Sequence, residues 1–140
     1  MTTAIDSNIF VAFWDTNDAL NSLAQSALNA AWNRGSLVVA PPVYAELLAS
    51  AGRTEGFLDS FLKETGITVD WEMDETLWRT AGRVFQSYAA RRRRHSGSGP
   101  RRILADFLIG AHALRGGYRL LTLDSGLYKA AFPRLTVIAL

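Results

Sequence analysis

Short apolar runs alternate with segments of helical periodicity over the whole chain, and this alternation limits the possible folds more than any other feature. The runs with the character of β-strands lie at residues 2–6, 37–40, 67–71, 118–123 and 135–140. Short strands that alternate with helices are joined by crossovers, which make the strands parallel and cover both faces of the sheet. The sequence therefore predicts an α/β protein with three layers, α/β/α, around a mainly parallel sheet of about five strands.

The segments between these runs carry signals that begin and end helices. Pro42 suits the first turn of a helix, Thr54 suits a cap, and Asp74 opens a long apolar-periodic segment. Gly35 and Gly66 each follow a segment that ends there. Helices are expected over residues 9–14 continuing into 17–32, then 42–51, 54–65, 74–94, 103–115 and 125–132.

Size and composition point to one globular unit without covalent staples. At 140 residues, with 49% hydrophobic and 20% charged side chains, residues 1–140 are expected to form a single domain. The absence of cysteine excludes disulfides and thiolate zinc sites. No leader segment or membrane-spanning run is recognised, so we expect a soluble protein, and the lack of cysteine fits a cytoplasmic one.

Two aspartates directly follow apolar runs that are expected to be strands. Asp6 follows Ala4-Ile5, and Asp124 follows Leu120-Leu121-Thr122-Leu123. Because parallel strands end at the same edge of a sheet, and ligands bind beyond that edge, the two carboxylates are expected to lie near each other. Taken singly, neither aspartate means much, because each can merely cap the helix that follows it.

Two further acidic residues stand in apolar helical segments. Asp106 lies in Ile103 to Ala111, which has no evident polar face, and Glu46 lies in Val43 to Ala49. An unpaired carboxylate in such a setting is costly unless it is hydrogen-bonded, neutralised or bound to a cation. A surface glutamate in an alanine- and leucine-rich helix is common, so the argument depends on the set of four.

Four carboxylates at one edge would repel each other, and a hard divalent cation would remove that repulsion. Oxygen ligands without histidine or cysteine favour Mg²⁺ or Mn²⁺. Such an ion can clamp a phosphodiester, lower the pKa of a bound water and stabilise the leaving oxygen. The residues predict a metal-dependent hydrolytic nuclease.

In four segments the chain resembles the PIN domain family, and more narrowly the VapC-type toxins of toxin–antitoxin pairs. The segments are Ile5-Asp6-Ser7-Asn8, Pro42 to Leu47 around Glu46, Ile103 to Ala113 around Asp106, and Leu121-Thr122-Leu123-Asp124. Their order and spacing span the whole chain. The resemblance implies Mg²⁺- or Mn²⁺-dependent cleavage of RNA, homodimerisation, and inhibition by a cognate antitoxin.

The resemblance also assigns roles to particular residues. It makes Asp6, Asp106 and Asp124 the principal metal ligands and catalytic acids, and Glu46 completes the site directly or through water. Ser7, Asn8 and Thr122 would support it. The family often has a further acid just after the last aspartate, whereas Ser125 follows here, which puts a second metal ion in doubt.

The charges are distributed unevenly, which suggests a polyanionic partner. Residues 1–70 carry 3 basic and 8 acidic side chains, and residues 71–140 carry 12 and 5. The candidate RNA-binding residues bracket a Gly- and Ser-rich loop expected at residues 95–100, and they are Arg91, Arg92, Arg93, Arg94, Arg101 and Arg102. An antitoxin could use the same arginines, and a solvated helix end explains the run equally well.

Other interpretations of the chain are weaker. A phosphatase with an aspartyl nucleophile at Asp6 usually needs a second acid two residues on, where Asn8 stands. A nuclease-inactive PIN-like domain that binds RNA or a protein is the alternative from another functional class. His112 is expected to be a core histidine, and the four tryptophans are expected to be core or interface residues.

Overall fold

The strands form one sheet at the centre of the molecule. The computed structural model describes residues 1–94 and 103–140. The order of its strands is β3-β2-β1-β4-β5, and every pairing is parallel. The strands are β1 (Thr3–Ile5), β2 (Leu37–Val39), β3 (Thr68–Val69), β4 (Arg119–Thr122) and β5 (Val137–Ala139). The predicted parallel sheet of about five strands is confirmed.

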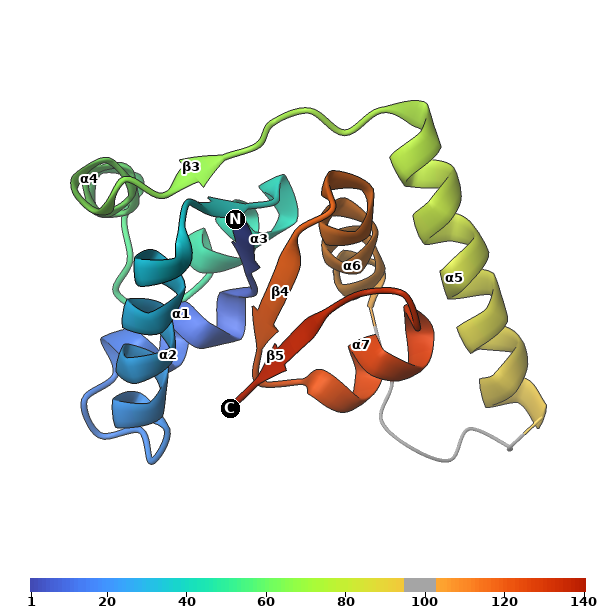
Figure 1. Ribbon diagram of the computed structural model, residues 1–140, viewed down its shortest axis with the longest axis horizontal. Helices are drawn as coiled ribbons and strands as arrows, with labels where there is room; N and C mark the ends of the chain where they lie inside the picture. Colours follow the sequence, from blue (N-terminus) through green and yellow to red (C-terminus); the bar gives the residue numbers. More distant parts are fainter. Residues whose placement is uncertain (95–102) are drawn as a thin grey trace.

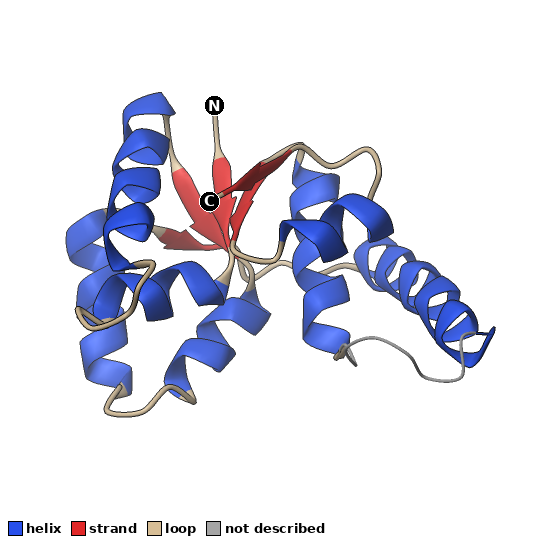
Figure 2. Cartoon of the chain, turned by 90° about the horizontal axis from the view of Figure 1, so that it is seen from below, coloured by secondary structure: helices blue, strands red, loops and turns tan. Residues whose placement is uncertain are grey.

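Helices lie on both sides of the sheet, as the alternating pattern predicts (Figure 2). In Figure 1, α2 and α4 lie at one side of the molecule, and α5 and α7 lie at the other. The helices of the described residues are α1 (Ser7–Trp14), α2 (Asn21–Arg34), α3 (Pro41–Leu48), α4 (Glu55–Thr65), α5 (Glu75–Arg94), α6 (Leu104–Gly116) and α7 (Ser125–Ala131). The loop expected at residues 95–100 lies outside the described residues, together with Arg101 and Arg102.

The first helical region is two helices, whereas the sequence predicted that residues 9–14 continue into 17–32. Two aspartates in the connection explain the break. The Asp15 carboxylate accepts a hydrogen bond from the Asn17 backbone N–H at 3.0 Å, and Asp18 accepts one from the Leu20 N–H at 2.7 Å. Such local bonds offer the backbone an alternative to the helix, so α1 ends and the chain turns before α2 begins.

Helix α6 is the most deeply buried helix in the described part of the chain. Phe107 to Ala113 are all buried, which confirms that this segment has no polar face. The Phe107 ring stacks on Phe85 of α5 with ring centroids 4.6 Å apart. A Cβ at Gly110 would collide with the Phe132 ring, so a glycine is needed for this close packing. This burial fixes the position of Asp106 in the first turn.

The order of the strands creates a switch point beside β1. The chain runs from β1 to β2 and β3 on one side, and then returns to β4 and β5 on the other. Connections leave β1 and β4 in opposite directions at their carboxyl ends, which is where ligands bind in sheets of this kind. Asp6 directly follows β1, and Asp124 follows β4 after one intervening residue.

Two of the four tryptophans are not core residues. Trp71 is 64% exposed and Trp78 is 48% exposed, whereas Trp14 and Trp32 pack against the core. None of the helices in residues 1–94 and 103–140 is both long enough and apolar enough to cross a bilayer.

Candidate active site

Asp6 is a buried carboxylate with both oxygens held by hydrogen bonds. It is 4% exposed and occupies the N-cap of α1, where Oδ1 accepts a bond from the Ser7 N–H at 2.7 Å. Oδ2 accepts a bond from the Thr122 hydroxyl at 2.8 Å. Asp6 is therefore a helix cap, and its second oxygen is fixed by a neighbouring strand as well.

Three polar residues tie the ends of β1 and β4 together. The Thr122 hydroxyl, which donates to Asp6, also accepts a hydrogen bond from the Asp124 N–H at 3.0 Å. The Asn8 side-chain oxygen accepts a bond from the Leu123 N–H at 3.1 Å, and its amide nitrogen lies 3.4 Å from Asp6 Oδ2. These bonds set the spacing between the two aspartate-bearing turns.

Glu46 reaches the same place from the second turn of α3. Its Oε1 accepts a hydrogen bond from the Ser7 hydroxyl at 2.9 Å, and that hydroxyl also lies 3.4 Å from Asp6 Oδ1. Ser7 is thus a bridge between two carboxylates that are 40 residues apart in the sequence. The residues predicted to support the site, Ser7, Asn8 and Thr122, all make such contacts, although their effect on activity stays a prediction.

The charges of the four acids influence one another. Burial raises the pKa of Asp6, the hydrogen bonds from Thr122 and Ser7 oppose that shift, and the charge of Asp124 adds to it. Burial also raises the pKa of Glu46, and the charges of Asp6 and Asp106 raise it further. The structure therefore brings all four predicted acids, from four separate parts of the chain, to one edge of the sheet. No cation of the described residues lowers either pKa.

Tyr128 is a site residue that the sequence did not suggest. Its side chain is fully buried, and its hydroxyl has no well-formed hydrogen bond within the described residues. It lies close enough to Asp6 to lower the pKa of that carboxyl. Burial, followed by the charges of Asp6 and Asp106, raises the pKa of Tyr128. Its position four residues after Asp124, on the same face of α7, is the one sequence signal that could have found it.

The carboxylate oxygens of the four acids suit a hard divalent cation. In the structure, however, these side chains do not yet converge around a single position. Within residues 1–94 and 103–140, no three acidic or histidine side chains converge closely enough to hold an ion. The bonded oxygens of Asp6 and Glu46 face Ser7 and Thr122, as expected for carboxylates that repel each other. Buried carboxylates whose pKa values are raised by one another's charges fit a cation with oxygen ligands.

The arginines of the run at the end of α5 differ in exposure. Arg91, Arg93 and Arg94 are exposed, and Arg92 is half-buried. Arg92 and Arg93 line a cavity between α5 and α6 together with Phe85, Tyr88 and Leu104. Arg91 lies against α7 instead. The arginines of the run therefore lie on two different surfaces, one facing α6 and one facing α7.

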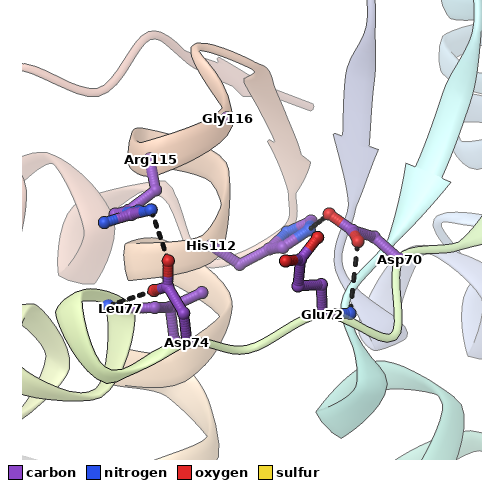
Figure 3. Close-up of a pocket in the computed structure, with 7 residues that line it drawn as sticks. All are labelled: Asp70, Glu72, Asp74, Leu77, His112, Arg115 and Gly116. Carbon is purple, nitrogen blue, oxygen red and sulfur yellow. Dashed lines mark hydrogen bonds and ion pairs between the residues drawn. The ribbon is translucent and has the colours of Figure 1, made fainter.

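A second polar cavity lies toward the end of α6 that is remote from Asp106 (Figure 3). His112 is 3% exposed there, and its Nε2 lies 3.1 Å from Asp70 Oδ2, while Nδ1 is buried with no partner in the described chain. Arg115 donates to Asp74 at 2.8 Å across the cavity. His112 is thus a buried histidine, as predicted, with only one of its ring nitrogens bonded.

The sequence comparison decides which family this arrangement represents. A profile of the PIN domain family matches residues 3–133. The chain belongs to the PIN domain family. Proteins with a PIN domain are generally nucleases, which hydrolyse phosphodiester bonds. No match to the chain is found among curated proteins.

Solved structures share the fold of this PIN domain. A chain of VapBC2 from Rickettsia felis, bound to a DNA fragment from its promoter, has a TM-score of 0.72 and 16% identity, covering 99% of this chain and 98% of that chain. VapBC-1 from nontypeable Haemophilus influenzae gives a TM-score of 0.65 and 17% identity, over 99% and 98%. FitAcB from Neisseria gonorrhoeae gives 0.65 and 19%, over 99% and 96%.

Proposed function

We propose that this PIN domain is a divalent-metal-dependent endoribonuclease and the toxin of a toxin–antitoxin pair. The observation that carries the proposal is the gathering of four carboxylates at the switch point of the sheet, where the charge of Asp124 raises the pKa of Asp6 and the charges of Asp6 and Asp106 raise that of Glu46. VapBC and FitAB are toxin–antitoxin complexes, and their structural likeness supports the biological role. An antitoxin partner and a homodimer are part of the same proposal.

Asp6, Asp106 and Asp124 would hold Mg²⁺ or Mn²⁺, and Glu46 would complete the site directly or through water. When bound, the ion supplies an activated water and charge stabilisation for the scissile phosphate. The protein's own contribution is positioning. Thr122 and Ser7 hold the two oxygens of Asp6 in fixed directions, and the hydrogen bond from Ser7 keeps Glu46 turned toward Asp6.

Cleavage of RNA by the purified chain tests this function. We expect cleavage with Mg²⁺ or Mn²⁺, none with EDTA, and a loss of orders of magnitude in the Asp6→Asn and Asp106→Asn variants. Asn8→Ala is a useful milder variant, because it removes a bond to the Leu123 N–H and leaves the acids in place. Full activity of the Asp106→Asn protein would contradict the assignment. Binding of RNA without cleavage by the wild type would favour the nuclease-inactive alternative.

A further inference from the structure

We propose that the groove between α5 and α7 binds the phosphates of the RNA strand that flanks the cleaved bond. This inference rests on the proposed function and adds the path of the substrate beyond the acidic site. The groove is lined on one side by α5 and on the other by α7 and the turn that follows it. Its lining residues are Arg83, Val84, Ser87 and Arg91 from α5, and Ala130, Ala131 and Pro133 from α7 and the turn after it.

The α5 side of the groove carries a row of hydrogen-bond donors, with Val84 beside them. Arg83, Ser87 and Arg91 are spaced by four residues, so they lie along one face of the helix, and all three are exposed. Arg83 and Arg91 are separated by roughly 12 Å at 1.5 Å per residue. At about 3.4 Å per nucleotide in a helical strand, that distance corresponds to three or four phosphates.

The surroundings of the groove are strongly positive. Residues 75–94 carry six arginines and one acid, Glu75, which pairs with Arg79 at 2.7 Å near the far end of α5. Residues 125–134 add Lys129 and Arg134 and contain no acid. The ion pairs among the described residues join Arg79 to Glu75, His112 to Asp70 and Arg115 to Asp74, so none of them neutralises the two arginines of the groove. Arg83 donates instead to the Thr80 hydroxyl, at 3.5 Å. Such a surface attracts a polyanion.

Helix α7 connects the groove to the acidic site. Asp124 stands at its N-cap, and Ala131 is its last residue. Seven residues of helix correspond to roughly 10 Å, so an RNA strand that leaves the site needs only a few nucleotides to reach the groove. Figure 1 shows α7 between the carboxyl edge of the sheet and the lower half of α5.

The lining favours RNA over a protein partner. Protein interfaces depend on large apolar anchors, and the α7 side of this groove offers only two alanines and a proline. On the α5 side Val84 is the one aliphatic side chain of the groove lining, whereas Phe85, Tyr88, Ile103 and Leu104 line the cavity on the α6 side of α5, with Arg92 and Arg93. The arginine run is thus divided, and Arg91 belongs to the phosphate-binding groove.

The test measures binding of a fluorescein-labelled single-stranded RNA of about 12 nucleotides by anisotropy. Every protein carries Asp106→Asn so that no cleavage occurs. Arg83→Gln with Arg91→Gln is compared with Arg34→Gln plus Lys63→Gln, which removes two exposed charges from α2 and α4 at the other side of the molecule. Arg83→Lys with Arg91→Lys keeps the charge and checks that the groove folds.

Loss of two phosphate contacts is expected to weaken binding about 25-fold at 0.1 M salt and to reduce the salt slope by about 1.4. The α2 and α4 variant should keep the wild-type salt slope within about 0.3, and the lysine variant should retain most of the affinity. In proteins with Asp106 restored, the groove variant should hydrolyse bis(p-nitrophenyl) phosphate like the wild type while RNA cleavage falls.

Three outcomes would overturn the inference in distinguishable ways. RNA affinity of the groove variant equal to that of the α2 and α4 variant removes the groove but leaves the proposed function intact. Intact RNA affinity with loss of binding to a cognate antitoxin would assign the groove to a protein. A wild-type chain that neither binds nor cleaves RNA would remove the proposed function, and the groove with it.

Discussion

At the scale of single residues, two buried threonines on adjacent strands have opposite hydrogen-bonding situations. The Thr122 hydroxyl of β4 donates to Asp6 at 2.8 Å and accepts from the Asp124 N–H at 3.0 Å. The Thr3 hydroxyl of β1 is equally buried and has no partner among the described residues. A satisfied buried hydroxyl stabilises a fold, whereas an unsatisfied one costs free energy. Because the two residues differ in this one respect, Thr3 can serve as the control for a substitution at Thr122.

Thr122→Val is expected to lower the free energy of unfolding by about 1–3 kcal/mol, because the Asp124 N–H and Asp6 lose a partner inside the fold. It should also reduce RNA cleavage, since the hydroxyl sets the direction of the Asp6 oxygen. Thr3→Val, the same change in β1, should be neutral or stabilising. Urea unfolding with EDTA present measures both. Equal losses in the two variants would show that the network around Thr122 contributes nothing particular.

The three aspartates of the candidate site could be singled out from the sequence because of their place in the local pattern, whereas Glu46 was suggested only as a member of the set. Asp6 and Asp124 ended apolar runs, and Asp106 interrupted an apolar helix. Tyr128 could not be found in the same way, since a tyrosine in a short amphipathic helix is ordinary. Its role depends on burial beside Asp6, which is a property of the folded chain.

At the scale of elements, prediction succeeded where hydrophobic periodicity and capping residues agree. Thr54 caps α4 by accepting from the Phe57 N–H at 3.1 Å, and Gly66 ends that helix in the left-handed conformation, both as predicted. The break between α1 and α2 was missed because Asp15 and Asp18 form local bonds within an otherwise helical composition. β3 has two residues, since only Thr68 and Val69 have a partner strand.

Helix α6 joins two polar sites, since it carries Asp106 in its first turn and His112 two turns later. Burial lowers the pKa of His112, and the bond to Asp70 opposes that shift only in part. The groups that face the ring are Asp70 and Glu72 from the β3–α5 connection, and the Tyr118 ring, whose centroid lies 5.5 Å away. The folded chain therefore binds a proton at His112 less readily than the unfolded chain.

This difference gives a pH dependence of known sign. Below the unfolded pKa of about 6.5, the unfolded chain is protonated at His112 before the folded chain, so stability falls as pH decreases through that window. We expect a loss on the order of 1 kcal/mol between pH 7 and pH 5 that is absent in His112→Gln. The comparison of the two proteins at each pH cancels the contributions of Asp6 and Glu46. A pH dependence that is identical in both proteins would contradict the prediction.

At the scale of the whole molecule, the sequence indicated parallel strands but could not give their order. Crossover connections follow from the alternation of strands and helices, whereas the placement of β4 beside β1 depends on which faces pack best in three dimensions. That placement is what brings Asp124 to Asp6 across more than a hundred residues of sequence. The sequence could therefore indicate that the candidate site lies at the carboxyl edge of the sheet, but not which side chains contact one another there.

Without a metal ion, the repulsion among the grouped acids should lower the stability of the folded chain, so that removing one of their charges raises the Tm. Because burial and the charges of Asp6 and Asp106 raise the pKa of Glu46, its ionised form costs stability at neutral pH. Gln at this position keeps the acceptor for Ser7 without the charge. In EDTA, Glu46→Gln should therefore have a higher Tm than the wild type, while Glu64→Gln on the exposed surface of α4 should not.

A divalent ion should reverse the order of the Tm values of the wild type and Glu46→Gln, because the ion binds the folded chain through the same acids. At a concentration 100 times its Kd, an ion bound only by the folded state adds about 2.7 kcal/mol of stability. We expect Mg²⁺ or Mn²⁺ to raise the Tm of the wild type and of Glu64→Gln by several degrees, and to raise that of Glu46→Gln by clearly less. Differential scanning fluorimetry with and without EDTA measures all three proteins. A wild-type Tm that does not respond to either ion would contradict the metal site.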